Sequence, residues 1–250
     1  MGCPTWPECT PGSYTPLPNQ IEGQLHSWIE FGNRLLTFVL VLSSLIVIVA
    51  VEKSKRKDLR ILAWTQLIGI FGQGILGGIT VLTDLNPIPV AGHMLLSMLL
   101  ISGATSLYYY SKYSLTKMDV DPLTKLIAQS HIVLSFVVIV LGTIVTGSGP
   151  HAGDYQARRF GFQVPTVAWI HAYSVISLVI ISLILFIKSN QRTRKVFRFF
   201  GVVVVAQGTI GFFQYYQGVP ELLVGAHLLG ASLFWIATWR IWLTLNTKNG

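Results

Sequence analysis

Three histidines lie inside long apolar segments of the chain, where an ionisable side chain is costly to bury. His93 and His227 each lie about seven residues inside the same end of their segments, and His171 lies at a similar depth in a third segment. With a helical rise of about 1.5 Å per residue, all three lie about 10 Å below one membrane surface. Such intramembrane groups are candidates for function. The simpler alternative is that each histidine only hydrogen-bonds a neighbouring helix.

His171 and His227 have the chemistry of a pair of axial ligands. Two neutral imidazoles that face each other across a helix bundle suit the two axial positions of a haem iron. Zinc would need a third or fourth ligand, and no cysteine or carboxylate lies near them in the expected bundle. Glycines on the neighbouring segments allow either a flat macrocycle or close helix packing, and they stand at positions 72, 74, 77, 78, 208 and 211.

Glu30 and Arg34 are one helical turn apart on the same face of the first apolar segment. One interpretation is that the two charges simply neutralise each other. The other is that Glu30 transfers a proton or stabilises charge, while Arg34 binds a propionate through a bidentate contact. Both interpretations stay open.

The region around Glu30 lacks a histidine that would pair with His93. Aligning His171 with the first half of the chain brings it near Asn33, an amide. His26 lies two turns before Asn33 on the same helix face and is the substitute candidate. The half with two histidine ligands predicts a permanently bound cofactor. The more open half, with one histidine, predicts a ligand that exchanges.

Cys3 and Cys9 are the only two cysteines and flank a short segment before the first apolar run. A disulfide persists in an oxidising compartment, where it would close this loop. The alternative is a redox pair that cycles between dithiol and disulfide.

The composition places these residues in a membrane protein. The chain has 250 residues, of which 52% are hydrophobic and 11% are charged, whereas soluble domains contain about 25% charged residues. An ordinary cytosolic enzyme is excluded. The net charge of +8 does not indicate nucleic-acid binding, because the basic residues lie between apolar runs.

We expect an all-α polytopic membrane protein with seven spans, over residues 28–52, 60–82, 87–110, 125–147, 165–188, 196–213 and 220–243. No alternating pattern of a membrane barrel is found. The positive-inside rule predicts that 15 of the 18 basic residues are cytoplasmic and that the N-terminus is outside. These are Lys53, Lys55, Arg56, Lys57, Arg60, Lys112, Lys117, Lys125, Lys188, Arg192, Arg194, Lys195, Arg198, Arg240 and Lys248.

An internal repeat relates the two halves of the chain. The segment Gly72-Gln-Gly-Ile-Leu-Gly77 recurs as Ala206-Gln-Gly-Thr-Ile-Gly211, and the same offset of 134 residues relates His93 to His227. The repeat predicts two pseudo-symmetric four-helix bundles, in residues 1–115 and 116–250. The first helix of the second half has no counterpart in the N-terminal half, which has only three helices, so we expect a natural protein with eight spans.

Five motifs together resemble haem A synthases. They are Cys3-Pro-Thr-Trp-Pro-Glu-Cys9, Glu30-x-x-Asn33-Arg34, Leu76-Gly-Gly-Ile-Thr-Val-Leu-Thr83 before His93, Thr146-Gly-Ser-Gly-Pro-His-Ala-Gly-Asp154, and Gln214-Tyr-Tyr-Gln-Gly-Val-Pro220 before His227. The resemblance implies an enzyme of the bacterial plasma membrane that oxidises the C8 methyl of haem O to the formyl of haem A, by successive hydroxylations, for cytochrome c oxidase.

The resemblance also implies roles for particular residues. His171 and His227 match ligands of a bound haem b. Glu30, as catalytic carboxylate, and His93 match the site for haem O, and the cysteines match an extracytoplasmic pair. The usual family pattern is Glu-x-x-His-Arg, so Asn33 leaves the substrate haem with one histidine or moves the second ligand to His26. This variant resembles the actinobacterial branch.

Partners and competing functions follow from the same features. We expect haem O synthase (protohaem farnesyltransferase), an electron donor of unknown identity and membrane lipid as partners, with no nucleic acid; a homo-oligomer stays open. The alternative function is a non-catalytic di-haem b electron-transfer subunit, against which Asn33 counts because it breaks the second histidine pair. A transporter would have broken helices around a site at the membrane midplane.

Overall fold

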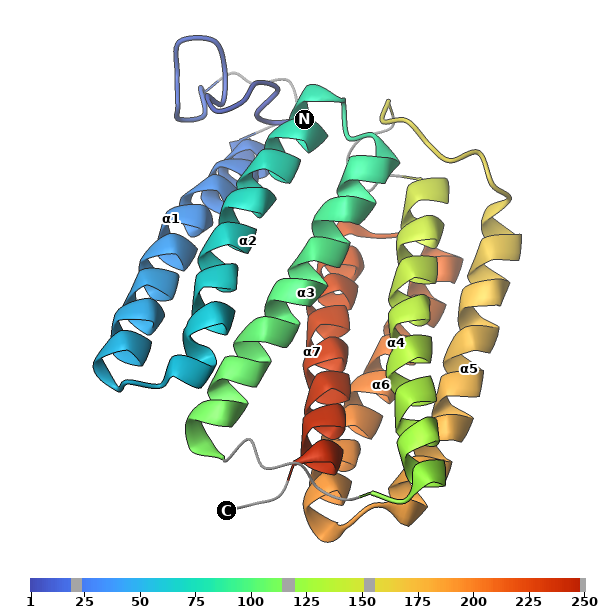
Figure 1. The fold of residues 1–250 in the computed structure, drawn as a ribbon. Helices are drawn as coiled ribbons and strands as arrows, with labels where there is room; N and C mark the ends of the chain where they lie inside the picture. Colours follow the sequence, from blue (N-terminus) through green and yellow to red (C-terminus); the bar gives the residue numbers. More distant parts are fainter. Residues whose placement is uncertain (19–23, 114–119, 151–155, 248–250) are drawn as a thin grey trace. The chain divides into compact units, whose positions relative to one another are not determined.

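The computed structural model describes residues 1–18, 24–113, 120–150 and 156–247, and this part of the chain is all-helical with no strand. It contains seven helices, which are labelled in Figure 1. They are α1 (Gln24–Lys53), α2 (Lys57–Leu82), α3 (Pro87–Lys112), α4 (Pro122–Ser148), α5 (Val164–Lys188), α6 (Gln191–Gln217) and α7 (Glu221–Asn246).

All seven helices are long and apolar enough to cross a membrane. Their large apolar side chains are widely exposed, for example Ile61 at 79% and Leu222 at 85%. Exposing so much apolar surface to water would be unfavourable, whereas lipid chains can cover it. The prediction of an all-α, multi-pass membrane protein with seven spans is confirmed.

Local sequence signals fix several helix ends. Asp121 caps α4 by accepting a hydrogen bond from the backbone N–H of Thr124 at 3.0 Å, and Pro122 occupies the first helical position. Hydrogen bonding from Thr124 holds the pKa of Asp121 below its ordinary value. Helix α6 is capped at its C-terminal end by Gly218, whose φ of 74° is the left-handed conformation that glycine adopts without strain. Both helices directly precede a helix that carries a candidate ligand, which is His171 on α5 or His227 on α7.

The chain forms two compact units, one of Met1–Gly103 with Gln156–Arg159 and the other of Ala104–Tyr155 with Phe160–Gly250. In the second unit α4 packs on α5 and α7, and α6 packs on the same two helices. The four helices thus form a closed bundle in which α5 and α7 stand diagonally opposite. The division at residues 115 and 116, which the repeat predicts, stays a prediction.

The last turns of α3 belong to the second unit and are bound to it by polar contacts. Tyr109 shares a hydrogen bond of 2.6 Å with Thr247 and accepts one of 2.8 Å from Arg192. Trp239 Nε1 donates to Ser106 Oγ at 2.7 Å. These contacts give the aromatic residues near the helix ends a structural role.

The first unit contains α1, α2 and most of α3. Helix α1 packs on α2, and Gln73 of α2 reaches α3, where its amide donates to the His93 carbonyl at 3.1 Å and to Ser97 Oγ at 2.6 Å. Because Ser97 also donates to the His93 carbonyl at 2.9 Å, this carbonyl accepts two hydrogen bonds. The α3 backbone at His93 is therefore tied to α2.

Candidate functional site

Each of the three candidate histidines packs its ring against a glycine of the preceding helix. A Cβ atom added to Gly77 would lie 3.6 Å from Cε1 of His93. The same contact would be 3.5 Å between Gly142 and His171, and 3.5 Å between Gly211 and His227; all six residues lie on the helix pairs α2–α3, α4–α5 and α6–α7. These distances leave room for a methyl group but not for a larger side chain.

The same nitrogen is enclosed in all three rings. Nδ1 of His93, His171 and His227 is buried and has no hydrogen-bond partner among the described residues. The His171 ring lies beside the backbone carbonyl of Val138. Because the Nδ1–Cε1 side of the rings faces the glycine helix, Nε2 is the nitrogen left for an external partner.

His171 and His227 come from the diagonally opposite helices α5 and α7 of the C-terminal bundle. Their rings are near enough to interact electrostatically. In the described residues, no group of three or more His, Cys, Asp or Glu side chains could hold a metal ion. Two imidazoles thus lie on opposite helices of the bundle, without a third protein ligand among the described residues. A structural zinc site would need four protein ligands.

His131 in the same bundle has a different environment. It is 1% exposed, its Nε2 lies 3.1 Å from Ser182 Oγ, and its ring packs against Phe197 and Phe200. The ring is enclosed by protein on all these sides. His131 is therefore a packed, hydrogen-bonded core residue and serves as the comparison for the three histidines above.

Glu30 binds the backbone of the N-terminal loop. Its Oε1 accepts the N–H of Gly2 at 2.9 Å and its Oε2 accepts the N–H of Cys3 at 2.7 Å. Gly2 rests directly on α1, since an added Cβ would lie 2.6 Å from Ser27 Cα. Each carboxylate oxygen has two lone pairs, so one hydrogen bond on each leaves acceptor capacity. The loop therefore orients the carboxylate without saturating it.

Arg34 holds the same loop through its carbonyl groups. Nη1 donates to Pro7 and Glu8 at 2.9 and 2.7 Å, and Nη2 donates to Cys3 and Thr5 at 3.0 and 2.9 Å. These four bonds use all four N–H groups of the terminal nitrogens. A bidentate contact between Arg34 and a propionate stays a prediction. To form it, Arg34 would have to give up hydrogen bonds to the loop carbonyls.

The loop is closed by a disulfide between Cys3 and Cys9, and both cysteines are completely buried. Trp6 packs on α2 at Gly78, where an added Cβ would lie 2.9 Å from the indole ring. The repeat places Phe212 at the position of Gly78 in the second half. Burial of both sulfurs supports a stapled loop more than a disulfide that exchanges readily with an external thiol.

The remaining candidate residues on α1 are Asn33 and His26. Asn33 is exposed and His26 is half-buried, and Asn33 lies outside the contacts that Glu30 and Arg34 make with the loop. His151 and Asp154 lie outside the described residues. A role of His26 as a haem ligand stays a prediction.

Two parts of this arrangement go beyond the predictions from the sequence. One is Gly142 behind His171, for which the resemblance of Leu141-Gly142-Thr143-Ile144 to Leu76-Gly77-Gly78-Ile79 is the available signal. The contacts of Glu30 and Arg34 with backbone groups of the loop carry no sequence signal, because any residue supplies an N–H or a carbonyl.

Replacing Arg34 with glutamine is expected to expose the disulfide. Charge-assisted hydrogen bonds are individually strong, so losing the four of Arg34 should let the loop open locally and speed disulfide reduction by dithiothreitol about tenfold or more. The measurement is the rate of maleimide labelling of the released thiols. Arg60→Gln, which removes an exposed ion pair with Glu52, is the control. Equal rates of disulfide reduction in the two variants would contradict the idea that Arg34 holds the loop closed.

A family comparison agrees with the motifs. The model of the COX15-CtaA family, described as a cytochrome oxidase assembly protein, matches residues 1–155. The match covers more than half of the 250 residues. No curated protein and no solved structure matches the chain.

Proposed function

The chain belongs to the family of cytochrome oxidase assembly proteins, and on this premise we propose that it is a haem A synthase, which oxidises the C8 methyl of haem O to the formyl of haem A. Membership of the family gives it a role in cytochrome oxidase assembly. The observation that carries the finer proposal is the pair His171 and His227, which come from opposite helices of one bundle.

The residues of the C-terminal bundle fit a haem. Each ring has a glycine behind it, and Nδ1 of each is buried without a partner. We propose that Nε2 of His171 and Nε2 of His227 hold the iron of haem b. Haem b, when bound, supplies an iron that takes up and gives up one electron at a time.

The N-terminal unit is the proposed site for haem O. It has His93 on α3 with its ring against Gly77, so one imidazole nitrogen is available to a substrate haem. With an exposed amide at Asn33, α1 offers no matching imidazole there. A single imidazole suits a ligand that must enter and leave better than a bis-histidine pair does.

Glu30 is the proposed catalytic carboxylate of this unit. Conversion of a methyl group to a formyl group breaks C–H bonds and requires proton transfer, and a fixed carboxylate can accept a proton. The N–H groups of Gly2 and Cys3 hold both oxygens in place, while free lone pairs remain for a proton. The loop, in turn, is held by Arg34. In this proposal Arg34 therefore acts on the reaction through the loop and Glu30.

The proposed location is the bacterial plasma membrane, with the basic helix ends cytoplasmic and the cysteine loop on the opposite side. The distribution of lysine and arginine supports this orientation. Haem O synthase is the proposed upstream partner, because haem O is the substrate.

The test is coexpression of the full chain with protohaem farnesyltransferase in a host that lacks haem A synthase. Haem extraction followed by chromatography should give haem A only when both proteins are present. Stable haem b binding without haem A would instead support the non-catalytic electron-transfer subunit.

Replacing Gly211 with leucine is expected to reduce haem b content. The leucine side chain would meet the His227 ring, since the Cβ alone reaches 3.5 Å from Cε1. We expect the haem-to-protein ratio to fall about tenfold or more. Gly201→Leu is the control on the same helix, because nothing lies within 4 Å of its added Cβ. The absorbance ratio of the purified variants measures the effect, and equal haem content in both would be inconsistent with a ring supported by Gly211.

A further inference from the structure

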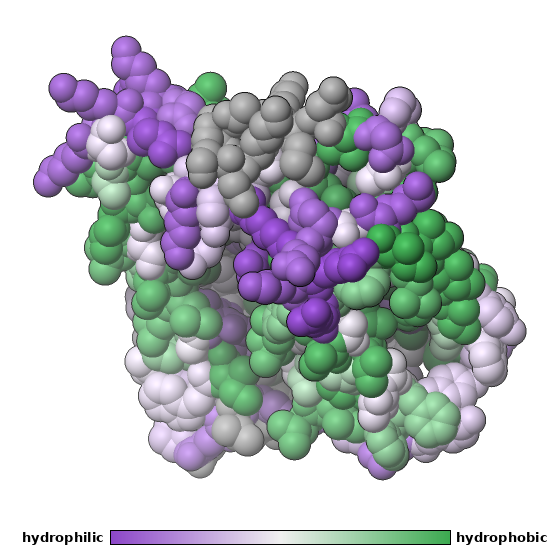
Figure 2. Space-filling model, turned by 90° about the horizontal axis from the view of Figure 1, so that it is seen from below, coloured by the Kyte–Doolittle hydropathy of each residue, from purple (hydrophilic) through white to green (hydrophobic). Residues whose placement is uncertain are grey.

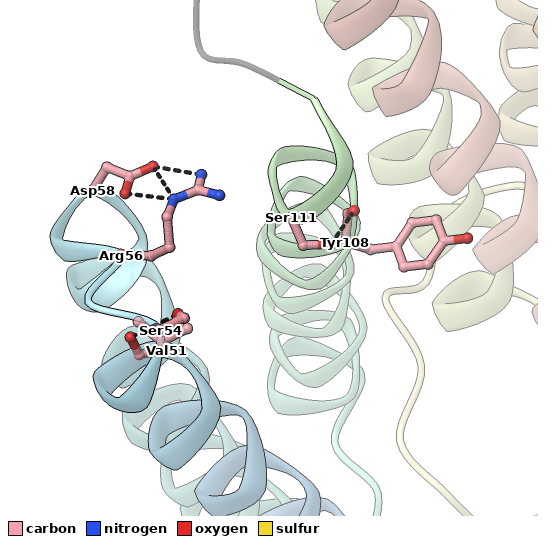
Figure 3. A network of polar contacts seen from close by, with 6 residues as sticks. All are labelled: Val51, Ser54, Arg56, Asp58, Tyr108 and Ser111. Carbon is pink, nitrogen blue, oxygen red and sulfur yellow. Dashed lines mark hydrogen bonds and ion pairs between the residues drawn. The ribbon is translucent and has the colours of Figure 1, made fainter.

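The first of two basic turns carries its own counter-charges. Between α1 and α2, Arg56 forms an ion pair of 2.7 Å with Asp58 and Arg60 forms one of 2.7 Å with Glu52. Figure 3 shows the Arg56–Asp58 pair. The side-chain hydrogen bond with Asp58 raises the pKa of Arg56. The positive charge of both arginines is thus largely offset within the protein.

At the second basic turn, between α5 and α6, two arginines and a lysine are engaged by the protein. Arg194 donates to the Phe186 carbonyl at 3.2 Å and to the Ile187 carbonyl at 2.9 Å, both at the end of α5. The Lys188 charge lies near Asp121. Arg192 binds the Tyr109 hydroxyl, as described above. Within the described part of this turn, only Lys188 therefore has a neighbouring carboxylate.

Lys195 and Arg198 differ from these cations. Both are exposed, and neither has a hydrogen bond or ion pair with any described residue. Together with Gln191 and Arg194 they line a pocket of about 310 Å³. Glu221, the other described carboxylate of this unit besides Asp121, begins α7 at the opposite end of the bundle. Among the described residues, three positive charges therefore share one concave surface without a local carboxylate.

The face of α6 that carries this pocket continues into an apolar stripe. Gln191, Lys195 and Arg198 are followed at helical spacing by Val202 and Val205, which are 68% and 70% exposed. Figure 2 views the helices from the end with the α5–α6 turn and shows hydrophilic residues gathered there, with hydrophobic residues around them. A ligand matching this stripe has an anionic head and an apolar tail.

We propose that the pocket of Gln191, Arg194, Lys195 and Arg198 binds the phosphate headgroup of an anionic phospholipid in the adjoining membrane leaflet. The acyl chains lie along Val202. Basic pockets near the ends of membrane helices have the charge and position to bind such headgroups. A free phosphate would satisfy the cations, but it would make no use of the apolar stripe below them.

Native mass spectrometry of the detergent-purified full chain tests the proposal, with phosphatidylglycerol, phosphatidylcholine and inorganic phosphate as separate probes. The wild-type chain should retain phosphatidylglycerol about tenfold more than phosphatidylcholine. The double variant Lys195→Gln/Arg198→Gln should lose about tenfold of this retention. Both positions are exposed, so the fold should persist, and an unchanged elution volume in size exclusion checks this.

Lys55→Gln/Lys57→Gln is the matched control, because it removes the same charge from the other basic turn. Its phosphatidylglycerol retention should stay within about twofold of wild type. Equal losses in the two double variants would overturn a specific site, as would equal retention of the two lipids. Displacement of phosphatidylglycerol by millimolar inorganic phosphate would show a phosphate site without lipid specificity, and would also overturn the proposal.

Discussion

Replacing His227 with alanine is expected to remove the low-spin haem b spectrum of the purified protein. The His227 ring is the only imidazole that α7 contributes, and it lies near the His171 ring of α5. In the proposed haem b site this change would leave the iron with His171 as its single protein ligand, so haem retention should fall about tenfold or more. The reduced-minus-oxidised absorption spectrum measures this.

His131→Ala is the control for this prediction. It removes another buried histidine from the same bundle, but one that is bonded to Ser182 and packed on phenylalanine rings. It should lower thermal stability, because it leaves a cavity and removes the hydrogen bond between His131 and Ser182, while any haem spectrum of the folded protein stays. A persistent low-spin spectrum in His227→Ala would show that other residues bind the iron.

Replacing Glu30 with glutamine should abolish most haem A formation while haem b stays bound. Glutamine keeps the size of the side chain but cannot accept a proton at neutral pH. Loss of a general base costs about 100-fold or more in rate. Haem extraction from cells that coexpress protohaem farnesyltransferase gives the ratio of haem A to haem O.

The Glu30 experiment must separate chemistry from loop position, because an amide can accept only one of the two loop N–H groups. Arg34→Gln loosens the same loop but leaves the carboxylate, so it should retain more activity than Glu30→Gln. Glu8→Gln removes a carboxylate within the loop, where Oε2 accepts the N–H of Gly12 at 2.9 Å, and should stay near wild type. Equal activity of the Glu30 and Arg34 variants would indicate that Glu30 only positions the loop.

These expectations link the cysteine loop to the proposed chemistry. Cys3 is both a disulfide partner and the donor of a hydrogen bond to Glu30. Anything that opens the loop therefore also changes the surroundings of the carboxylate. The two halves of the repeat differ at the position on which the cysteine loop packs. In the first half Trp6 of the loop packs on Gly78, whereas the equivalent residue of the second half is Phe212.

Much of the fold could be predicted from the sequence, because a membrane reduces the options. Lipid requires each crossing segment to satisfy its own backbone, so a run of about 20 apolar residues predicts a helix without any knowledge of its neighbours. Each of the seven expected spans corresponds to one helix of the structure, and only Pro220, which caps α7, lies outside its helix. Several helices extend beyond the expected span, as α4 does because Asp121 caps it before its apolar part begins.

The candidate ligands could be named for a similar reason. Few ionisable residues occur within membrane helices, so His93, His171 and His227 were conspicuous from depth and repeat position alone. The glycines that pack against these rings were harder to predict from the sequence. Gly142 stands among many glycines, and helix packing uses glycine for several purposes.

The sequence by itself determined the class of the protein, its seven helices, its repeat and the short list of residues with useful chemistry, because these depend on local composition and on helical spacing. Only the tertiary structure decided which nitrogen of each histidine is enclosed, and that Glu30 and Arg34 bind the cysteine loop. Those contacts join residues 26 to 31 positions apart through backbone N–H and carbonyl groups. Every residue except proline carries both groups, so only the folded path of the chain selects the pairs that meet.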